Sequence, residues 1–122
     1  MAAFSQKEGN TKIIVKVKDT TNLHKRVKVA FINLDFIVKD LEGDTLKTYP
    51  REFLDNAYLV ANAVIDGDQV TLSGVSGSRK INFMGYYTSP KDFNTVIYFR
   101  GGVAWKLLQL VADGIGGEKR YE

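Results

Sequence analysis

Apolar and polar residues alternate over residues 12–18, where Ile13, Val15 and Val17 fall on one face and lysines on the other. Such alternation is typical of a half-buried β-strand. Residues 25–32 repeat the pattern, so we interpret them as a second strand. The polar residues between the two would form the turn of a hairpin. The outer face of this hairpin would then carry a stripe of basic side chains.

Turn-forming residues divide the middle of the chain. Glu42-Gly43-Asp44 separates residues 36–39 from residues 45–49, as in a β-hairpin. Residues 50–62 carry apolar side chains at helical spacing, which favours a short helix that begins near its proline. The β-branched and aromatic content of the same region leaves a strand over residues 58–65 as the alternative.

The next turn signal is Asp66-Gly67-Asp68, which predicts a tight turn into a strand over residues 70–72. Residues 73–78 are rich in glycine and serine and are expected to form a loop. Residues 79–87 and 95–100 are predicted to form two more strands.

A helical pattern follows Gly101-Gly102. Residues 103–111 are apolar apart from one narrow polar stripe, and this apolar face is wider than a helix at the edge of a fold needs. The pattern predicts a helix that ends at the glycines from residue 114 onward. Its wide apolar face indicates either deep packing against the sheet or a homo-oligomer interface. The residues predicted at that interface are Val103, Leu107, Leu110 and Val111.

Together these elements predict an α+β fold that is mainly β. We expect a curved antiparallel sheet of about five to seven strands, an apolar C-terminal helix and, as an option, the short mid-chain helix. Residues 11–114 would form one globular domain. Residues 1–10 are expected to be a flexible arm and residues 115–122 a flexible tail.

The amino-acid composition limits which classes of function the chain could have. The chain has 122 residues, of which 44% are hydrophobic and 25% charged, as in an ordinary globular domain. It has no cysteine, which excludes disulfides and thiolate chemistry, and its single histidine, His24, argues against histidine-based catalysis or a two-histidine metal site. We therefore expect no catalytic residues, no metal and no cofactor. Without a secretory signal or an apolar run of membrane length, the expected location is the cytoplasm.

Charge is segregated along the chain. Residues 11–28 carry six cations and one acid, whereas residues 33–68 carry eight acids and three cations. Lysines protect sheet edges from pairing, but six cations exceed what that role needs. With a net charge of +3, this cluster favours an anionic partner.

Two glycine-containing segments add candidate phosphate contacts. Arg100-Gly101-Gly102 precedes the predicted C-terminal helix, whose first N–H groups could hold a phosphate, and residues 76–80 form a basic, hydroxyl-bearing segment. Neither matches a P-loop or dinucleotide fingerprint. The residues predicted to bind phosphate are Lys16, Lys18, Arg26, Lys28, Arg79, Lys80, Arg100, Gly101 and Gly102.

Aromatic residues are concentrated between residues 83 and 105. Strand alternation would set Tyr86, Tyr87 and Tyr98 beside cations on a sheet surface, as in proteins that stack single-stranded bases. The ordinary preference of tyrosine for strands explains the same placement without a ligand.

These observations favour a protein that binds an anionic ligand without catalysing a reaction. Single-stranded DNA or RNA is the first interpretation, since no predicted helix offers a basic face to a major groove. The alternative is a nucleotide or another phosphorylated small molecule, held in a pocket at a subunit interface. The third is a protein-docking or inhibitory module that uses segregated charge.

Overall fold

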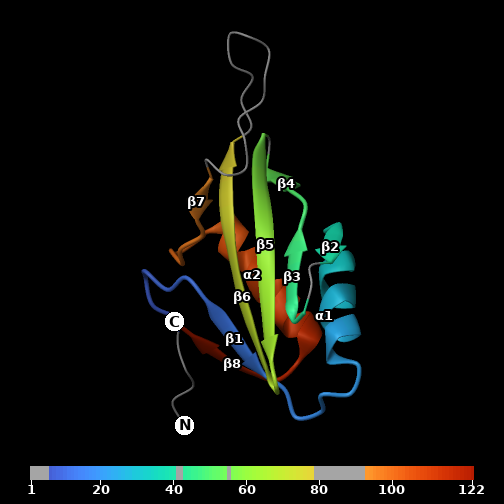
Figure 1. Ribbon diagram of the computed structural model, residues 1–122. Helices are drawn as coiled ribbons and strands as arrows, with labels where there is room; N and C mark the ends of the chain where they lie inside the picture. The colour runs from blue at the N-terminus through green and yellow to red at the C-terminus, as the bar shows by residue number, and fades with distance from the viewer. Residues whose placement is uncertain (1–5, 41–42, 55, 79–92) are drawn as a thin grey trace.

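Two ten-residue strands, β5 and β6, form the longest hairpin among the described residues and the centre of the sheet (Figure 1). The computed structural model describes residues 6–40, 43–54, 56–78 and 93–122. The elements are β1 (Ile13–Lys16), α1 (Leu23–Ile32), β2 (Val38–Asp40), β3 (Thr45–Thr48), β4 (Arg51–Leu54), β5 (Ala57–Asp66), β6 (Gln69–Ser78), β7 (Asn94–Thr95), α2 (Val103–Ile115) and β8 (Glu118–Tyr121).

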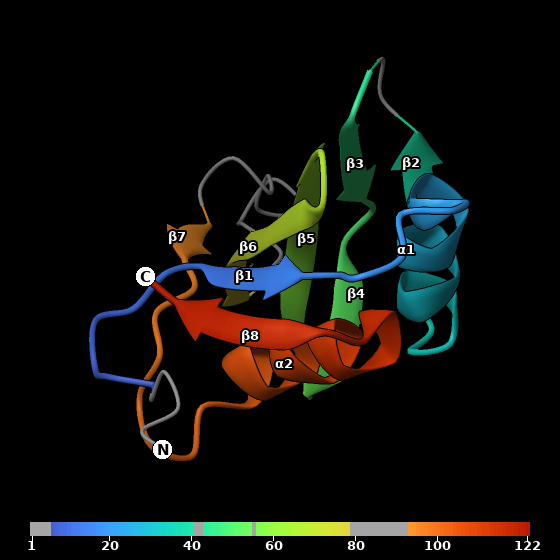
Figure 2. The same cartoon turned by 90° about the horizontal axis from the view of Figure 1, so that it is seen from below.

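The eight strands of the described residues form one open antiparallel sheet in the order β2-β3-β5-β6-β1-β8, with β4 also paired to β5 and β7 to β6. The predicted mainly β fold with a C-terminal helix is therefore confirmed, although the sheet has one strand more than expected. Seen from below, α2 lies along one side of the sheet, beneath β1 and β8 (Figure 2). No helix in the described ranges is both long enough and apolar enough to cross a membrane.

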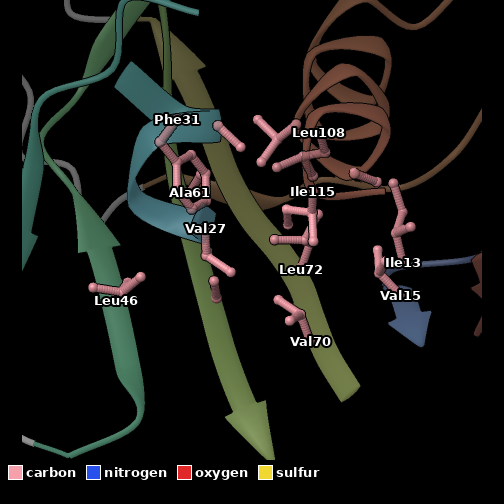
Figure 3. Close-up of a cluster of buried hydrophobic side chains, with 14 of the residues drawn as sticks. Ile13, Val15, Val27, Phe31, Leu46, Ala61, Val70, Leu72, Leu108 and Ile115 are labelled. Carbon is pink, nitrogen blue, oxygen red and sulfur yellow. The ribbon is translucent and has the colours of Figure 1, made fainter. Parts of the chain in front are cut away.

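The strand register places apolar residues of neighbouring strands in one row of the core. Leu46 faces Ala63, Ala63 faces Leu72, and Leu72 faces Ile13 across four neighbouring strands. All four side chains are fully buried. Figure 3 shows how side chains of both helices, among them Phe31 and Leu108, point toward this same face of the sheet. One face is thus covered by α1 and α2.

Residues 25–32 are a helix, so the predicted second strand and its hairpin with residues 12–18 are wrong. Val27 and Phe31 lie four residues apart, a spacing that puts two side chains on one face of a strand and of a helix alike. Ala30 and Val29 distinguish the two, because the structure buries Ala30 and leaves Val29 43% exposed. Burial therefore follows the helical period. Strand β1 pairs instead with β6 and β8.

The helix predicted over residues 50–62 is also wrong, and the alternative of a strand is correct. Strand β4 ends at Leu54, Asn56 turns the chain with a φ of +61°, and β5 begins at Ala57. The predicted loop over residues 73–78 belongs to β6, because Gly74 and its small neighbours fit closely against β5. Pairing along the whole hairpin satisfies the backbone groups of this segment.

Other boundaries follow the sequence more closely. The hairpin of residues 36–49 is present as β2 and β3, and Gly67 turns the chain between β5 and β6 with a φ of +60°. Of the strand predicted over residues 95–100, only Thr95 lies in a strand, β7, which also includes Asn94. The predicted strand over residues 79–87 lies outside the described residues.

The predicted flexible segments make ordered contacts where they are described. In the expected tail, residues 118–121 form β8 against β1. In the expected arm, Gln6 accepts a hydrogen bond from the indole of Trp105, and the N–H of Gly9 donates to the carbonyl oxygen of Tyr98 at 3.3 Å. The tail pairs because β1 offers it a free edge, and strand pairing outweighs the charge of its side chains.

Helices α1 and α2 touch through two small residues. A Cβ built on Gly114 would lie 3.3 Å from the Cβ of Ala30, which is closer than most such contacts. The helix α2 continues to Ile115, one residue beyond the first predicted stop, and ends at Gly116 with a φ of +79°. A positive φ of this size is readily adopted by glycine, which has no Cβ.

Gly117 provides the first testable prediction. Its φ is +131°, and a Cβ at this position would overlap the backbone oxygen of Lys16. Gly117→Ala should therefore lower the free energy of unfolding by roughly 2–4 kcal/mol, through backbone strain and overpacking, as measured by urea denaturation. Gly43→Ala is the matched control, since Gly43 has a φ of +75° but open space around it. It should cost only about 1 kcal/mol. Equal losses in the two variants would contradict the close approach.

A candidate anion-binding groove

A groove of about 800 Å³ lies where the end of β1 meets the turn before α1, the β5–β6 turn and the α2–β8 connection. We call it the lysine groove. Its lining residues are Lys16, Val17, Lys18, Asp19, Arg26, Asp68, Ile115, Gly116, Gly117 and Glu118. Three regions that are distant in the sequence, residues 16–26, Asp68 and residues 115–118, therefore contribute to one concave surface.

The lysines of the groove follow from the alternation of β1. Val15 and Val17 are buried, so Lys16 and Lys18 are exposed. The N–H of Val17 donates to the carbonyl oxygen of Asp68 at 2.8 Å, which continues the pairing one residue past the strand. Among the described carboxylates, none forms an ion pair with either ammonium group.

Arg26 links the groove to both helices. It belongs to α1, and its guanidinium donates hydrogen bonds to the backbone oxygens of Asp19 and of Ile115, the latter at 3.3 Å. The second bond satisfies a carbonyl at the C-terminus of α2 and sets a positive charge against the negative end of that helix. A guanidinium carries five N–H donors, and these two bonds use two of them.

Three carboxylates share the groove with these cations. Glu118 faces Lys16 across the β1–β8 pair. Asp19 lies in the turn before α1, and Asp68 lies in the β5–β6 turn. The Asp19 carboxylate accepts a hydrogen bond from the N–H of Thr21 at 2.9 Å. That backbone bond, followed by a bond to the Thr21 side chain, lowers the pKa of Asp19 below its ordinary value. The lining thus combines three cations with three acids.

Among the described residues, the other predicted phosphate contacts do not line the groove. Lys28 forms an ion pair of 2.8 Å with Asp40 and lowers the pKa of that carboxyl group. Arg100 and Gly101 are exposed, and Gly102 precedes α2 at the end opposite the groove. Arg79 and Lys80 lie outside the described residues.

Of the three tyrosines predicted for stacking, the structure describes Tyr98. Tyr98 is half-buried, and its ring lies 5.7 Å from that of Trp105, centroid to centroid. Tyr86 and Tyr87 lie outside the described residues. The Tyr98 ring therefore contributes to the packing around α2.

The helix residues predicted for an oligomer interface are divided between core and surface. Val111 is fully buried within the chain, against the expectation of a subunit contact, and Leu107 is partly buried. Val103 and Leu110 remain 38% and 41% exposed. Much of the wide apolar face thus packs on the chain's own sheet.

Sequence reasoning missed several lining residues of the groove. Gly116 and Gly117 were identified only as a helix stop, and Glu118 only as part of a tail. Two adjacent glycines between a helix and a charged tetrapeptide were the available signal. Which strand the tetrapeptide would pair with depends on β1, more than one hundred residues earlier.

The comparisons with protein families and with curated proteins give no information about the function of this chain. No protein family model matches this chain, and no curated protein matches its sequence significantly. Within the described ranges, no group of three or more histidine, cysteine, aspartate or glutamate side chains could hold a metal ion.

The carboxyl group of Asp19 gives a prediction about pH. Because its pKa is lower in the folded than in the unfolded chain, it stabilises the fold above its ordinary pKa, and this contribution is lost as pH falls through the folded value. Thr21→Ala keeps the backbone N–H bond but removes the side-chain bond. We expect the pKa of Asp19 to rise part of the way to its ordinary value, as measured by NMR titration of the carboxyl carbon.

Asp40 is the internal control for this titration, since its pKa depends on Lys28 and should not change. A Thr21→Ala variant in which Asp19 titrates like an unfolded aspartate would contradict the larger role of the backbone bond.

Proposed function

We propose that this protein binds a small phosphorylated molecule of nucleotide size in the lysine groove and does not transform it. The observation that carries the proposal is the convergence of Lys16, Lys18 and Arg26 from two elements and their linker onto one concave surface. A volume of about 800 Å³ lies within the range of small-molecule pockets, which is about 300–1,000 Å³. Neither lysine forms an ion pair with a described carboxylate, so both are available to phosphate oxygens.

The three acidic side chains of the groove limit which class of ligand it could bind. A long polyanion would meet Asp19, Asp68 and Glu118 as well as the cations, and like charges repel. A nucleotide offers both kinds of group, because its phosphate accepts hydrogen bonds while its sugar hydroxyls and base amines donate them. Carboxylates are acceptors only, so they suit the donating part of such a ligand.

The groove also favours a small ligand over a nucleic-acid strand. Arg100 lies before the N-terminus of α2 and the groove at its C-terminus, and a helix of 13 residues is about 20 Å long. Tyr98 packs against Trp105 and gives no free stacking surface beside the lysines. These features support the pocket binder over the single-strand binder. The proposed pocket is formed by one chain, whereas the sequence suggested a subunit interface.

Isothermal titration calorimetry tests the proposal with inorganic phosphate, pyrophosphate, adenosine diphosphate and an oligothymidylate of about eight nucleotides. We expect adenosine diphosphate to bind, and Lys16→Gln and Lys18→Gln each to weaken it by roughly tenfold, since a charged hydrogen bond contributes about 1.5–3 kcal/mol. Lys47→Gln is the matched control, because Lys47 is also an exposed strand lysine but lies on β3. It should bind like the unmodified protein.

Two outcomes would overturn the proposal. The first is the absence of heat with any of the phosphate compounds. The second is tight binding of the oligonucleotide alone with a steep loss of affinity in salt, which would favour the single-strand binder instead.

A further inference from the structure

A second hollow lies at the opposite end of α2, and apolar side chains line most of it. Its volume is about 560 Å³. Four of the large apolar side chains that are exposed in the described chain, Leu54, Ile97, Phe99 and Val103, line this one hollow. Exposed apolar residues that occur singly are normal, but a contiguous group of them marks a binding surface. We call this hollow the apolar cleft.

Local structure holds the side chain of Phe99 in place. The N–H of Gly102 donates to the carbonyl oxygen of Phe99 at 3.0 Å, and Gly101 turns the chain between them with a φ of +83°. The Phe99 ring lies over Gly102, where a Cβ would be 3.2 Å from a ring carbon. Phe99 is therefore 59% exposed to solvent and yet packed against its own turn. An exposed ring that is already ordered loses little freedom when a ligand binds.

Another hollow, with a more polar lining, adjoins the cleft. A neighbouring hollow of about 410 Å³ shares Phe99, Gly101, Val103 and Trp105 with it, and is also lined by Gln6, Tyr98, Gly102, Lys106 and Gln109. Lys106 is exposed, and no described carboxylate forms an ion pair with it. The apolar cleft thus borders a hollow that carries a lysine without an ion pair to any described carboxylate.

We propose that the two hollows together bind a small amphipathic carboxylate, namely a fatty acid of about eight to twelve carbons. Its acyl chain lies in the apolar cleft against Phe99, and its carboxylate lies beside the ammonium of Lys106. The match of an apolar body and a single anionic head to an apolar cleft and a single cation carries this assignment. This site lies at the end of α2 remote from the lysine groove and does not depend on it.

The chain provides its own reporter for this site. Trp105 is the only tryptophan, and it lines both hollows. Titration with octanoate, decanoate and dodecanoate should change its fluorescence, with affinity rising by roughly tenfold for each two methylenes added. The alcohols of the same chain lengths should bind more weakly than the acids, because they lack the charge.

Variants separate the two halves of the proposal. Phe99→Ala should weaken dodecanoate by roughly tenfold, while Tyr49→Ala, which also removes a half-exposed aromatic ring, should leave its affinity unchanged. Lys106→Gln should weaken dodecanoate by roughly tenfold and leave dodecanol unaffected. Adenosine diphosphate binding should be the same in all three variants, so a failure here is distinct from a failure at the lysine groove.

Three results would overturn the proposal. One is a Trp105 fluorescence that no acid up to dodecanoate changes. Another is an equal effect of Lys106→Gln on the affinities for the acid and the alcohol. That result would show that the ligand carboxylate does not pair with Lys106. The third is a dimer in sedimentation that Phe99→Ala dissociates. That result would show that a second copy of the chain occupies the cleft.

Discussion

Burial of one face of α2 against the sheet is the interaction on which the rest of the structure depends. Trp105, Leu108, Val111 and Ile115 are each no more than 3% exposed. Burial of one such side chain stabilises a fold by about 1.5–3 kcal/mol, so this contact is comparable to the whole net stability of a small domain. It also fixes where the two ends of the helix lie, and each end borders one of the two hollows that are proposed to bind ligands.

The order of the strands explains why α2 can lie there. β1 is inserted between β6 and β8, so the sheet beneath the helix is made of segments from both ends of the sequence. Two side chains of β8 contact the flank of the helix: Lys119 pairs with Asp113, and the Tyr121 ring packs beside Trp105. The polar stripe of α2 is thus partly used against β8.

Elements with a single consistent pattern were predictable from the sequence. The helix α2, the β2–β3 hairpin and the turn at Gly67 each have a clear period or a glycine at the required φ. Helix α1 was not, because Val27 and Phe31 satisfy two periods at once and only tertiary contact distinguishes them. The paired β8 was missed for a different reason, since its charged residues carry no strand signal and its partner is distant in the sequence.

The candidate groove was predictable only in part, and charge along the chain was a poor guide to charge in space. Lys16, Lys18 and Arg26 do meet, as their shared basic segment suggested. Lys28, from the same segment, is paired with Asp40 from the acid-rich one. Segregated segments can neutralise one another when the fold brings them together, and this depends on topology that local pattern does not contain.

The contact between Ala30 and Gly114 has a consequence for how the lysine groove could change in evolution. Neither residue lines that groove, yet their small size lets α1 approach α2 closely enough for Arg26 to reach the carbonyl oxygen of Ile115. A larger side chain at either position would separate the two helices and withdraw the guanidinium from its backbone acceptor. The shape of the groove therefore depends partly on two small residues outside it. Substitution of either one could alter ligand selectivity while every lining residue stays the same.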